Sequence, residues 1–186
     1  IPPMEDFYIG MASERIFLPL IQKTHPEIKD MHFPAAGIFH NIVILSIDKR
    51  YPGHARKIMS AVWGLGQLMF SKTVIVVDKD VNVHDPAEVE WAVATRFQAD
   101  RDLVVIAGAQ GSALDPSTSI TFTGNKPPLE WQGFGAKMGL DATKPIRSSE
   151  HVFTRVRIPG ESEVDLATAI TATGTAALAG TALERA

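Results

Sequence analysis

A lysine surrounded by glycines is the pattern in this sequence that most directly suggests binding chemistry. Glycines stand at positions 133, 135 and 139 around Lys137, in a segment that we predict to be a loop. Glycine lets backbone N–H groups approach an anion closely, and a lysine adds a compact positive charge that suits phosphate. Lys137 is therefore a candidate phosphate-binding residue, and the alternative is a mobile, solvated side chain.

A group of acidic residues has the spacing that begins a calcium-binding loop. Asp78, Asp80 and Asn82 stand where the first three ligands of such a loop would be. The loop also needs a glycine at its sixth position and a bidentate glutamate at its twelfth, and these positions are Val83 and Val89. We therefore predict no calcium site, and we expect Asp78 and Asp80 to end a strand, with their carboxylates solvated or bonded within turns.

Other catalytic and metal-binding patterns are missing from the sequence. The chain has no cysteine, which excludes disulfides, thiolate nucleophiles and cysteine-based metal sites. Its six histidines are scattered, with no pair at i and i+4 and no accompanying glutamate, so we predict no metal site. No Gly-x-Ser-x-Gly segment occurs, which leaves hydrolase chemistry without support.

The strands that must position these residues are predicted from short apolar runs. Residues 41–47, 73–77 and 103–107 are rich in β-branched residues and nearly continuous in apolar character, which is typical of strands covered on both faces. We expect these three to form the centre of one sheet. Residues 31–33 and 120–122 could add edge strands and make the sheet mixed.

Helical patterns separate the predicted strands. Residues 12–24 and 54–71 are amphipathic, and a third helix begins where Asp85 can cap, Pro86 fits the first turn and Glu88 completes a capping box. Crossovers of this length between strands imply right-handed βαβ units. We therefore predict an α/β fold, a three-layer α/β/α sandwich around a mixed, mainly parallel sheet.

Composition and charge narrow the function classes. With 186 residues, 45% of them hydrophobic, the chain can bury one good core and falls in the size range of a single domain. A net charge of -3 and a pI near 6.1 give no bulk attraction to nucleic acid or anionic lipid. The sequence shows no membrane span or signal peptide, so we expect a cytoplasmic protein.

Eight segments carry a resemblance to one family. They include Pro-Pro-Met-Glu-Asp at 2–6, Asp-Lys-Asp-Val-Asn-Val at 78–83 and Lys-Met-Gly-Leu-Asp-Ala-Thr at 137–143, and the others lie at 10–20, 51–55, 61–64, 91–96 and 114–117. In this order they cover nearly the whole chain, which resembles the C-terminal domain of the UbiD-type decarboxylases. The resemblance implies a reversible, non-oxidative (de)carboxylase for aromatic or α,β-unsaturated carboxylic acids that uses prenylated FMN.

The resemblance also implies roles for a few residues. Lys137 matches a lysine that reaches toward the phosphate of the prenylated flavin, and Ile9 and Met11 match a region that approaches the substrate. An ordinary place in the core is the alternative for Ile9 and Met11. The family's catalytic acids, its divalent metal and potassium sites and most of its flavin contacts belong upstream of the matched segments, so no catalytic residue is assigned here.

From these matches we expect the chain to be part of a longer protein, which would also explain why it begins with Ile1. Residues 1–160 would form the UbiD-type C-terminal domain, and a tail at 161–186 would mediate homodimers or larger homo-oligomers. The expected partners are the missing cofactor domain and a small carboxylic acid. The chain alone would be inactive, and the alternative is a stand-alone α/β binding or assembly module without catalysis.

Overall fold

The structure is a computed structural model that describes residues 4–112, 114–118, 134–148, 150–154 and 156. It divides into two compact units, Ile1–Ser149 and Glu150–Ala186. In the second unit the described residues include a short 3-10 helix, η4 (Glu150–Phe153). The first unit contains α1 (Met4–Gln22), β1 (Ile28–His32), η1 (Ala35–Gly37), β2 (Ile42–Ile47), α2 (His54–Trp63), η2 (Gly66–Phe70), β3 (Thr73–Asp78), α3 (Pro86–Arg96), α4 (Ala99–Asp102), β4 (Leu103–Gln110) and β5 (Phe134–Ala142).

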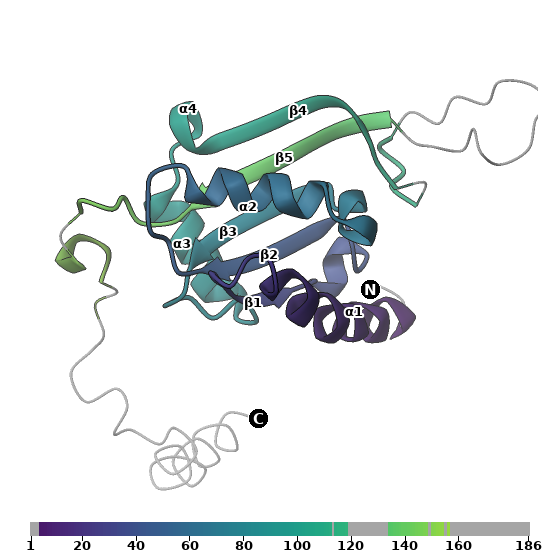
Figure 1. Ribbon diagram of the computed structural model, residues 1–186, viewed down its shortest axis with the longest axis horizontal. Helices are drawn as coiled ribbons and strands as arrows, with labels where there is room; N and C mark the ends of the chain where they lie inside the picture. The colour runs from purple at the N-terminus through teal and green to yellow at the C-terminus, as the bar shows by residue number, and fades with distance from the viewer. Residues whose placement is uncertain (1–3, 113, 119–133, 149, 155, 157–186) are drawn as a thin grey trace, which may run out of the picture. The chain divides into compact units, whose positions relative to one another are not determined.

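One five-stranded sheet organises the first unit, in the order β1-β2-β3-β5-β4 (Figure 1). The three central strands β2, β3 and β5 run parallel, whereas β1 and β4 pair antiparallel at the two edges. The predicted α/β fold with a mixed sheet and a parallel centre is thus confirmed. Both the run at 120–122 and the tail at 161–186 lie outside the described residues.

Helices cover both faces of this sheet because residues on β2 and β3 alternate in direction. Leu45 and Val76 belong to one buried cluster that contains side chains of α1 and α2, among them Ile58. Ile44 belongs to a second cluster that contains Val89 of α3. Successive side chains of a strand point to opposite faces, so a continuous apolar run can serve two helical layers. Three layers result, with α2 crossing in front of the strands in Figure 1.

The glycine–lysine segment is a central strand, and the prediction of a loop there was wrong. β5 pairs with β3 on one side and β4 on the other. A Cβ at Gly139 would lie 2.5 Å from the Met59 Sδ atom and 3.1 Å from the Trp63 ring. Gly139 is therefore required for the close packing of α2 on β5, which is a structural reason for a glycine that sequence reasoning assigned to anion binding.

The predicted position of the strand Leu103–Gln110 in the sheet was also wrong. It was expected at the centre of the sheet, but β4 is an edge strand, antiparallel to β5, and Val105 and Ile106 are 60% and 42% exposed. β5 occupies the position next to β3 that a second βαβ unit would have given to β4. Strand propensity depends on local residue types, whereas the neighbour of a strand depends on pairing with distant segments.

The helices are confirmed in type and corrected in extent. α1 begins at Met4 rather than near residue 12, and the predicted helix at 54–71 is interrupted after Trp63, so that η2 follows as a separate turn. Asp85 caps α3 as expected, because its side chain accepts a hydrogen bond from the Ala87 N–H at 2.9 Å. Glu88 does not complete a capping box; it accepts from the Asn82 N–H instead. None of the helices in the described ranges is long and apolar enough to cross a membrane.

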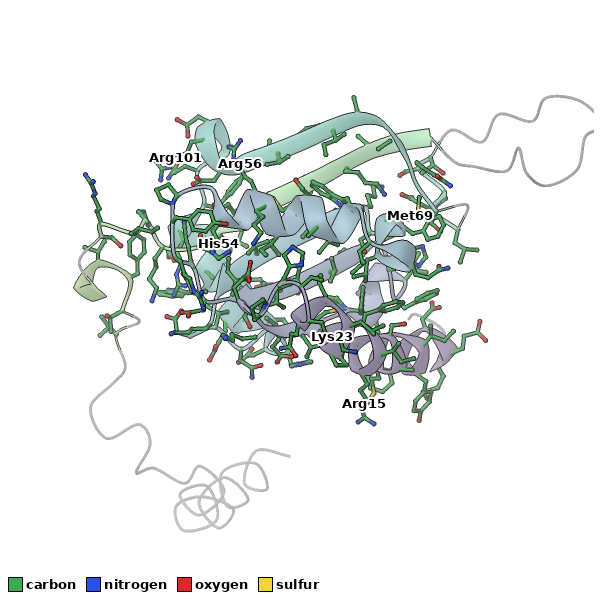
Figure 2. All side chains as sticks on the ribbon, viewed as in Figure 1. Arg15, Lys23, His54, Arg56, Met69 and Arg101 are labelled. Carbon is green, nitrogen blue, oxygen red and sulfur yellow. The ribbon has the colours of Figure 1, made fainter. Side chains whose placement is uncertain are left out.

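A buried carboxylate, Glu27, bonds two residues near the start of α2 and leads to a prediction about pH. Glu27 is 5% exposed, and its Oε1 lies 2.8 Å from Lys57 Nζ and 3.0 Å from His54 Nε2 (His54 is labelled in Figure 2). Burial raises the pKa of Glu27, but the hydrogen bonds from Lys57 and His54 outweigh burial and lower the pKa to about 2. Because the folded pKa is below the ordinary value of 4.5, this stabilisation is present above pH 4.5 and is lost as the pH falls toward 2.

We expect Glu27→Gln to lower the free energy of unfolding at pH 7 by about 2–3 kcal/mol. The free energy of unfolding of this variant should also decrease less than that of the parent chain as the pH falls. Urea unfolding at pH 7 and at pH 3 measures both effects. The exposed Glu90 of α3 gives a matched control, Glu90→Gln, which should change neither. Equal stability of the Glu27 variant and the parent chain at pH 7 would contradict the prediction.

Candidate functional site

A cavity of about 640 Å³ lies between α1, the segment after β1, η2 and the residues that follow β4. Its size suits a small organic ligand. Apolar and polar side chains share the lining, which comprises Ser13, Phe17, Phe33, Phe39, His40, Gln67, Leu68, Phe70, Ser71, Gln110, Gly111, Ser112 and Leu114. These residues come from four distant parts of the sequence, so the cavity exists only in the folded chain.

His40 is the most unusual side chain of this cavity. It is 8% exposed, and within the described residues neither of its ring nitrogens makes a hydrogen bond of good geometry, although the backbone of Ile38 lies close enough to raise its pKa. The hydroxyl of Ser71, which is 1% exposed, also lacks a partner there. Burial lowers the pKa of His40, so the ring is neutral near pH 7 and offers one donor and one acceptor. Buried polar groups without partners are costly, and a ligand in the cavity could satisfy both residues.

The backbone that presents His40 has a special conformation. Ile38 and Phe39, the two residues before it, have φ angles of 50° and 41°. Non-glycine residues in this left-handed region are uncommon and cost of the order of 1 kcal/mol or more each. The left-handed turn follows η1 and directs the chain into β2, and the Phe39 and His40 rings lie 4.5 Å apart.

A charged cluster lies beside the cavity. Lys72 follows the cavity residue Ser71, and its Nζ is 3.0 Å from Asp115 Oδ2 and hydrogen-bonds Ser117 Oγ. Burial raises the pKa of Asp115, but the hydrogen bonds from Ser117 and Lys72 outweigh burial and hold this pKa below its usual value. The charges of Asp115 and Lys137 both act on His40. The cavity thus has an ionised carboxylate and two lysines nearby.

Lys137 belongs to this cluster but is less accessible than the sequence suggested. It is 5% exposed on β5, and its Nζ donates a 2.6 Å hydrogen bond to the carbonyl oxygen of Met69, which Figure 2 labels. Burial lowers the pKa of Lys137, and the nearby Asp115 partly offsets this effect. A mobile, solvated lysine, the alternative considered for Lys137, does not agree with this burial.

Ile9 and Met11 lie on α1 and flank Gly10, which packs against Phe33. The side chain of Ile9 is 43% exposed, and Met11 is half-buried. Neither belongs to the described lining of the cavity, to which α1 contributes Ser13 and Phe17. Their predicted role in a substrate pocket remains a prediction.

Sequence reasoning missed His40 and Lys72. His40 was one of six scattered histidines, and Lys72 preceded a predicted strand without any special spacing. The segment 114–117 did have a signal, because it is one of the family-like segments. The link between these residues is spatial, so no pattern of spacing could have revealed it.

The acidic residues Asp78 and Asp80 form ion pairs at the C-terminal end of β3, which is the end away from Ser71 and the cavity. Arg96 Nη1 lies 2.7 Å from Asp78 Oδ2, and Arg96 Nη2 lies 3.2 Å from Asp80 Oδ2. Lys144 adds a backbone N–H to Asp78 and its ammonium to Asp80. Asp78 ends β3, as the sequence predicted. The expectation of a solvated or turn-bonded carboxylate was wrong for Asp78, because this residue is 8% exposed and both acids pair with residues 16 to 66 positions away in sequence.

Comparison with known families gives one match that covers most of the chain. Residues 7–142 match the family described as the 3-octaprenyl-4-hydroxybenzoate carboxy-lyase C-terminal domain, UbiD_C. Similar curated proteins include an uncharacterized protein of Archaeoglobus fulgidus, 49% identical over 146 residues, and one of Aquifex aeolicus, 44% identical over 154 residues. The two alignments cover 78% and 83% of this chain but only 28% and 29% of those relatives.

Solved structures of UbiD-class enzymes have the same fold. HmfF from Pelotomaculum thermopropionicum in complex with FMN superposes with a TM-score of 0.71 at 35% identity, covering 86% of this chain and 33% of that enzyme. The apo 3,4-dihydroxybenzoic acid decarboxylase of Enterobacter cloacae gives a TM-score of 0.64 at 26% identity, covering 83% and 32%. The chain therefore spans about a third or less of the length of these four relatives.

Proposed function

The chain belongs to the family of UbiD carboxy-lyase C-terminal domains, and from this premise we propose that it is the C-terminal part of a decarboxylase that uses prenylated FMN. The proposed reaction is the reversible, non-oxidative (de)carboxylation of an aromatic or α,β-unsaturated carboxylic acid. In such an enzyme the bound prenylated flavin supplies the electron sink for loss of carbon dioxide. An upstream domain would hold most of the flavin, the divalent metal, the potassium ion and the catalytic acids.

The observation that carries this proposal is the cavity with the unpartnered His40 and Ser71. Both are buried polar groups with free hydrogen-bonding capacity, and apolar rings surround them. This combination fits a planar acid, whose ring would contact phenylalanines while a polar substituent bonds the neutral imidazole. We propose that His40 binds and orients the substrate, and that carbon dioxide loss itself depends on groups of the upstream domain.

The lysine cluster supports contact with the flavin phosphate. We propose that Lys137 contributes to this contact from β5 and that Lys72, whose side chain is 41% exposed, lies closer to the phosphate. Asp115 holds Lys72 in place through the 3.0 Å ion pair. Lysine ammonium groups are common phosphate ligands, and they act as point charges.

Further parts of the proposal concern surfaces where other segments would meet this one. Ile9 and Met11 would line the substrate pocket on the side of the upstream domain. The apolar residues Val164, Leu166 and Ile170 of the tail would contact a second copy of the chain in a homodimer or a larger homo-oligomer. We propose a cytoplasmic location for the complete enzyme.

The test of the function compares the 186-residue chain with the longer protein of its source organism. We expect the longer protein, loaded with prenylated FMN, to release carbon dioxide from at least one acid in a panel of aryl and acrylic acids. The chain alone should neither retain flavin nor release carbon dioxide. An intact mass of 20.2 kDa for the source protein would instead favour the stand-alone module.

Replacing His40 by leucine should lower the activity of the longer enzyme without destabilising the fold. Because neither ring nitrogen has a described protein partner, His40→Leu should leave the free energy of unfolding unchanged or raise it by up to about 2 kcal/mol. In the longer enzyme the same change should lower kcat/KM at least about tenfold, since a substrate hydrogen bond is lost. Full activity of the variant would remove His40 from the substrate site.

A further inference from the structure

A second cluster of metal-binding side chains lies outside the cavity. Glu14 from α1, His32 from the end of β1 and His84 from the turn between β3 and α3 each offer one ligand atom, and the three atoms lie within 4.8 Å of one another. Glu14 Oε1 is 2.7 Å from His32 Nδ1, and the His32 and His84 rings are 4.6 Å apart. We infer that these residues form a binding site for a divalent transition metal ion, with Zn²⁺ as the preferred ion.

The ligand types favour zinc over magnesium or calcium. Two imidazoles and one carboxylate suit a borderline ion such as Zn²⁺, whereas Mg²⁺ and Ca²⁺ prefer oxygen ligands. At Zn–ligand distances of about 2.0–2.2 Å, ligand atoms in a tetrahedral site lie roughly 3.3–3.5 Å apart. The present group therefore needs side-chain adjustments of about 1 Å, and a water molecule would supply the fourth ligand.

Nearby groups hold the proposed ligands in place. The Phe33 N–H donates a 2.7 Å hydrogen bond to Glu14 Oε1, which keeps the carboxylate turned toward His32. Asp30 Oδ2 lies 3.3 Å from His84 Nε2, so a carboxylate can orient the second imidazole. Carboxylates that bond to a liganding histidine are the usual second layer around zinc and increase its affinity.

The three proposed ligands come from different parts of the chain, and none lies near another in sequence. A bound ion would therefore connect α1, β1 and the turn before α3. Ser13 and Phe33, the neighbours of Glu14 and His32, line the cavity described above. An ion in the cluster would stabilise two walls of that cavity without belonging to it.

Metal titration of the untagged, EDTA-treated chain tests this site without any flavin or activity measurement. We expect one Zn²⁺ per chain by calorimetry and a visible absorption spectrum of tetrahedral Co²⁺ in the same site. His84→Gln should lower the Zn²⁺ affinity at least about tenfold. Because His84 is 45% exposed, its replacement should leave the melting temperature of the metal-free chain unchanged.

A matched control comes from a histidine outside the cluster. His25, in the turn after α1, hydrogen-bonds Thr24, and His25→Gln should leave the Zn²⁺ affinity unchanged. Glu14→Gln should weaken binding as His84→Gln does. Absence of stoichiometric binding, or equal affinities in the parent chain, His84→Gln and His25→Gln, would overturn the site. Either result would leave the proposed decarboxylase function unaffected, since that function is tested separately.

Discussion

Replacing Arg96 by methionine is expected to lower the free energy of unfolding by about 3–5 kcal/mol, the usual cost of removing one partner of a buried ion pair. Arg96 is 4% exposed, and it bonds Asp78 and Asp80 while its guanidinium lies 5.2 Å from the Trp91 ring. Methionine fills a similar volume, but it leaves the buried Asp78 with only the Lys144 backbone N–H as a donor among its described contacts. Urea unfolding of the chain at pH 7 measures the loss.

Two further variants test whether the loss of stability comes from the buried ion pair. Arg101 on α4, labelled in Figure 2, is 59% exposed and lies 3.2 Å from Asp102, so Arg101→Met should cost less than about 1 kcal/mol. Adding Asp78→Asn to Arg96→Met should recover part of the stability, because the uncompensated charge is then removed. Similar stabilities for the Arg96 and Arg101 variants would show that the Arg96 cluster contributes little.

Alanine variants of Lys72 and Lys137, the two lysines beside the cavity, are expected to weaken flavin retention in the longer enzyme. In the proposed contact with the flavin phosphate, each of Lys72→Ala and Lys137→Ala would remove a charge-assisted bond worth about 1.5–3 kcal/mol, equivalent to roughly 10- to 150-fold in affinity. The double variant should lose more than either single variant. Flavin absorbance of the purified enzyme, together with titration of the flavin-free enzyme, measures both content and affinity.

Loss of the lysine charge and loss of side-chain volume can each lower flavin content, and two variants of Lys137 distinguish them. Lys137 is buried and bonds the Met69 carbonyl, so Lys137→Ala also leaves a void, whereas Lys137→Met retains most of the volume. Lys23, an exposed residue after α1 that Figure 2 labels, provides the control Lys23→Ala. If Lys137→Met keeps full flavin content while Lys72→Ala loses it, the phosphate contact belongs to Lys72 and Lys137 is structural.

The order and type of the main elements were predictable from local sequence. β2 and β3 appear as continuous β-branched runs because both faces of these strands are buried, and Asp85-Pro86 marks the start of α3 through short-range bonding. Each of these signals depends on residues within a few positions of one another. The family resemblance, which rests on several such segments in one order, was predictable for the same reason.

The order of the strands in the sheet could not be predicted from local sequence. The segment Phe134–Ala142 contains two glycines and a lysine, which weaken a strand by propensity, yet it forms β5, one of the three central strands. Pairing with β3 and β4 and the contact of Gly139 with α2 outweigh that propensity. The same pairing moves β4 to the edge of the sheet.

By itself the sequence determined the α/β class, the ends of several elements and the membership in a family of carboxy-lyase domains, because these depend on short patterns of residue type. Only the tertiary structure decided which polar side chains meet. It buried Lys137 against Met69, left His40 without a described partner in the cavity, and placed His32 beside His84 across 52 positions of sequence. Such contacts arise from long-range strand pairing and helix packing, and the spacing of residues along the chain does not predict them.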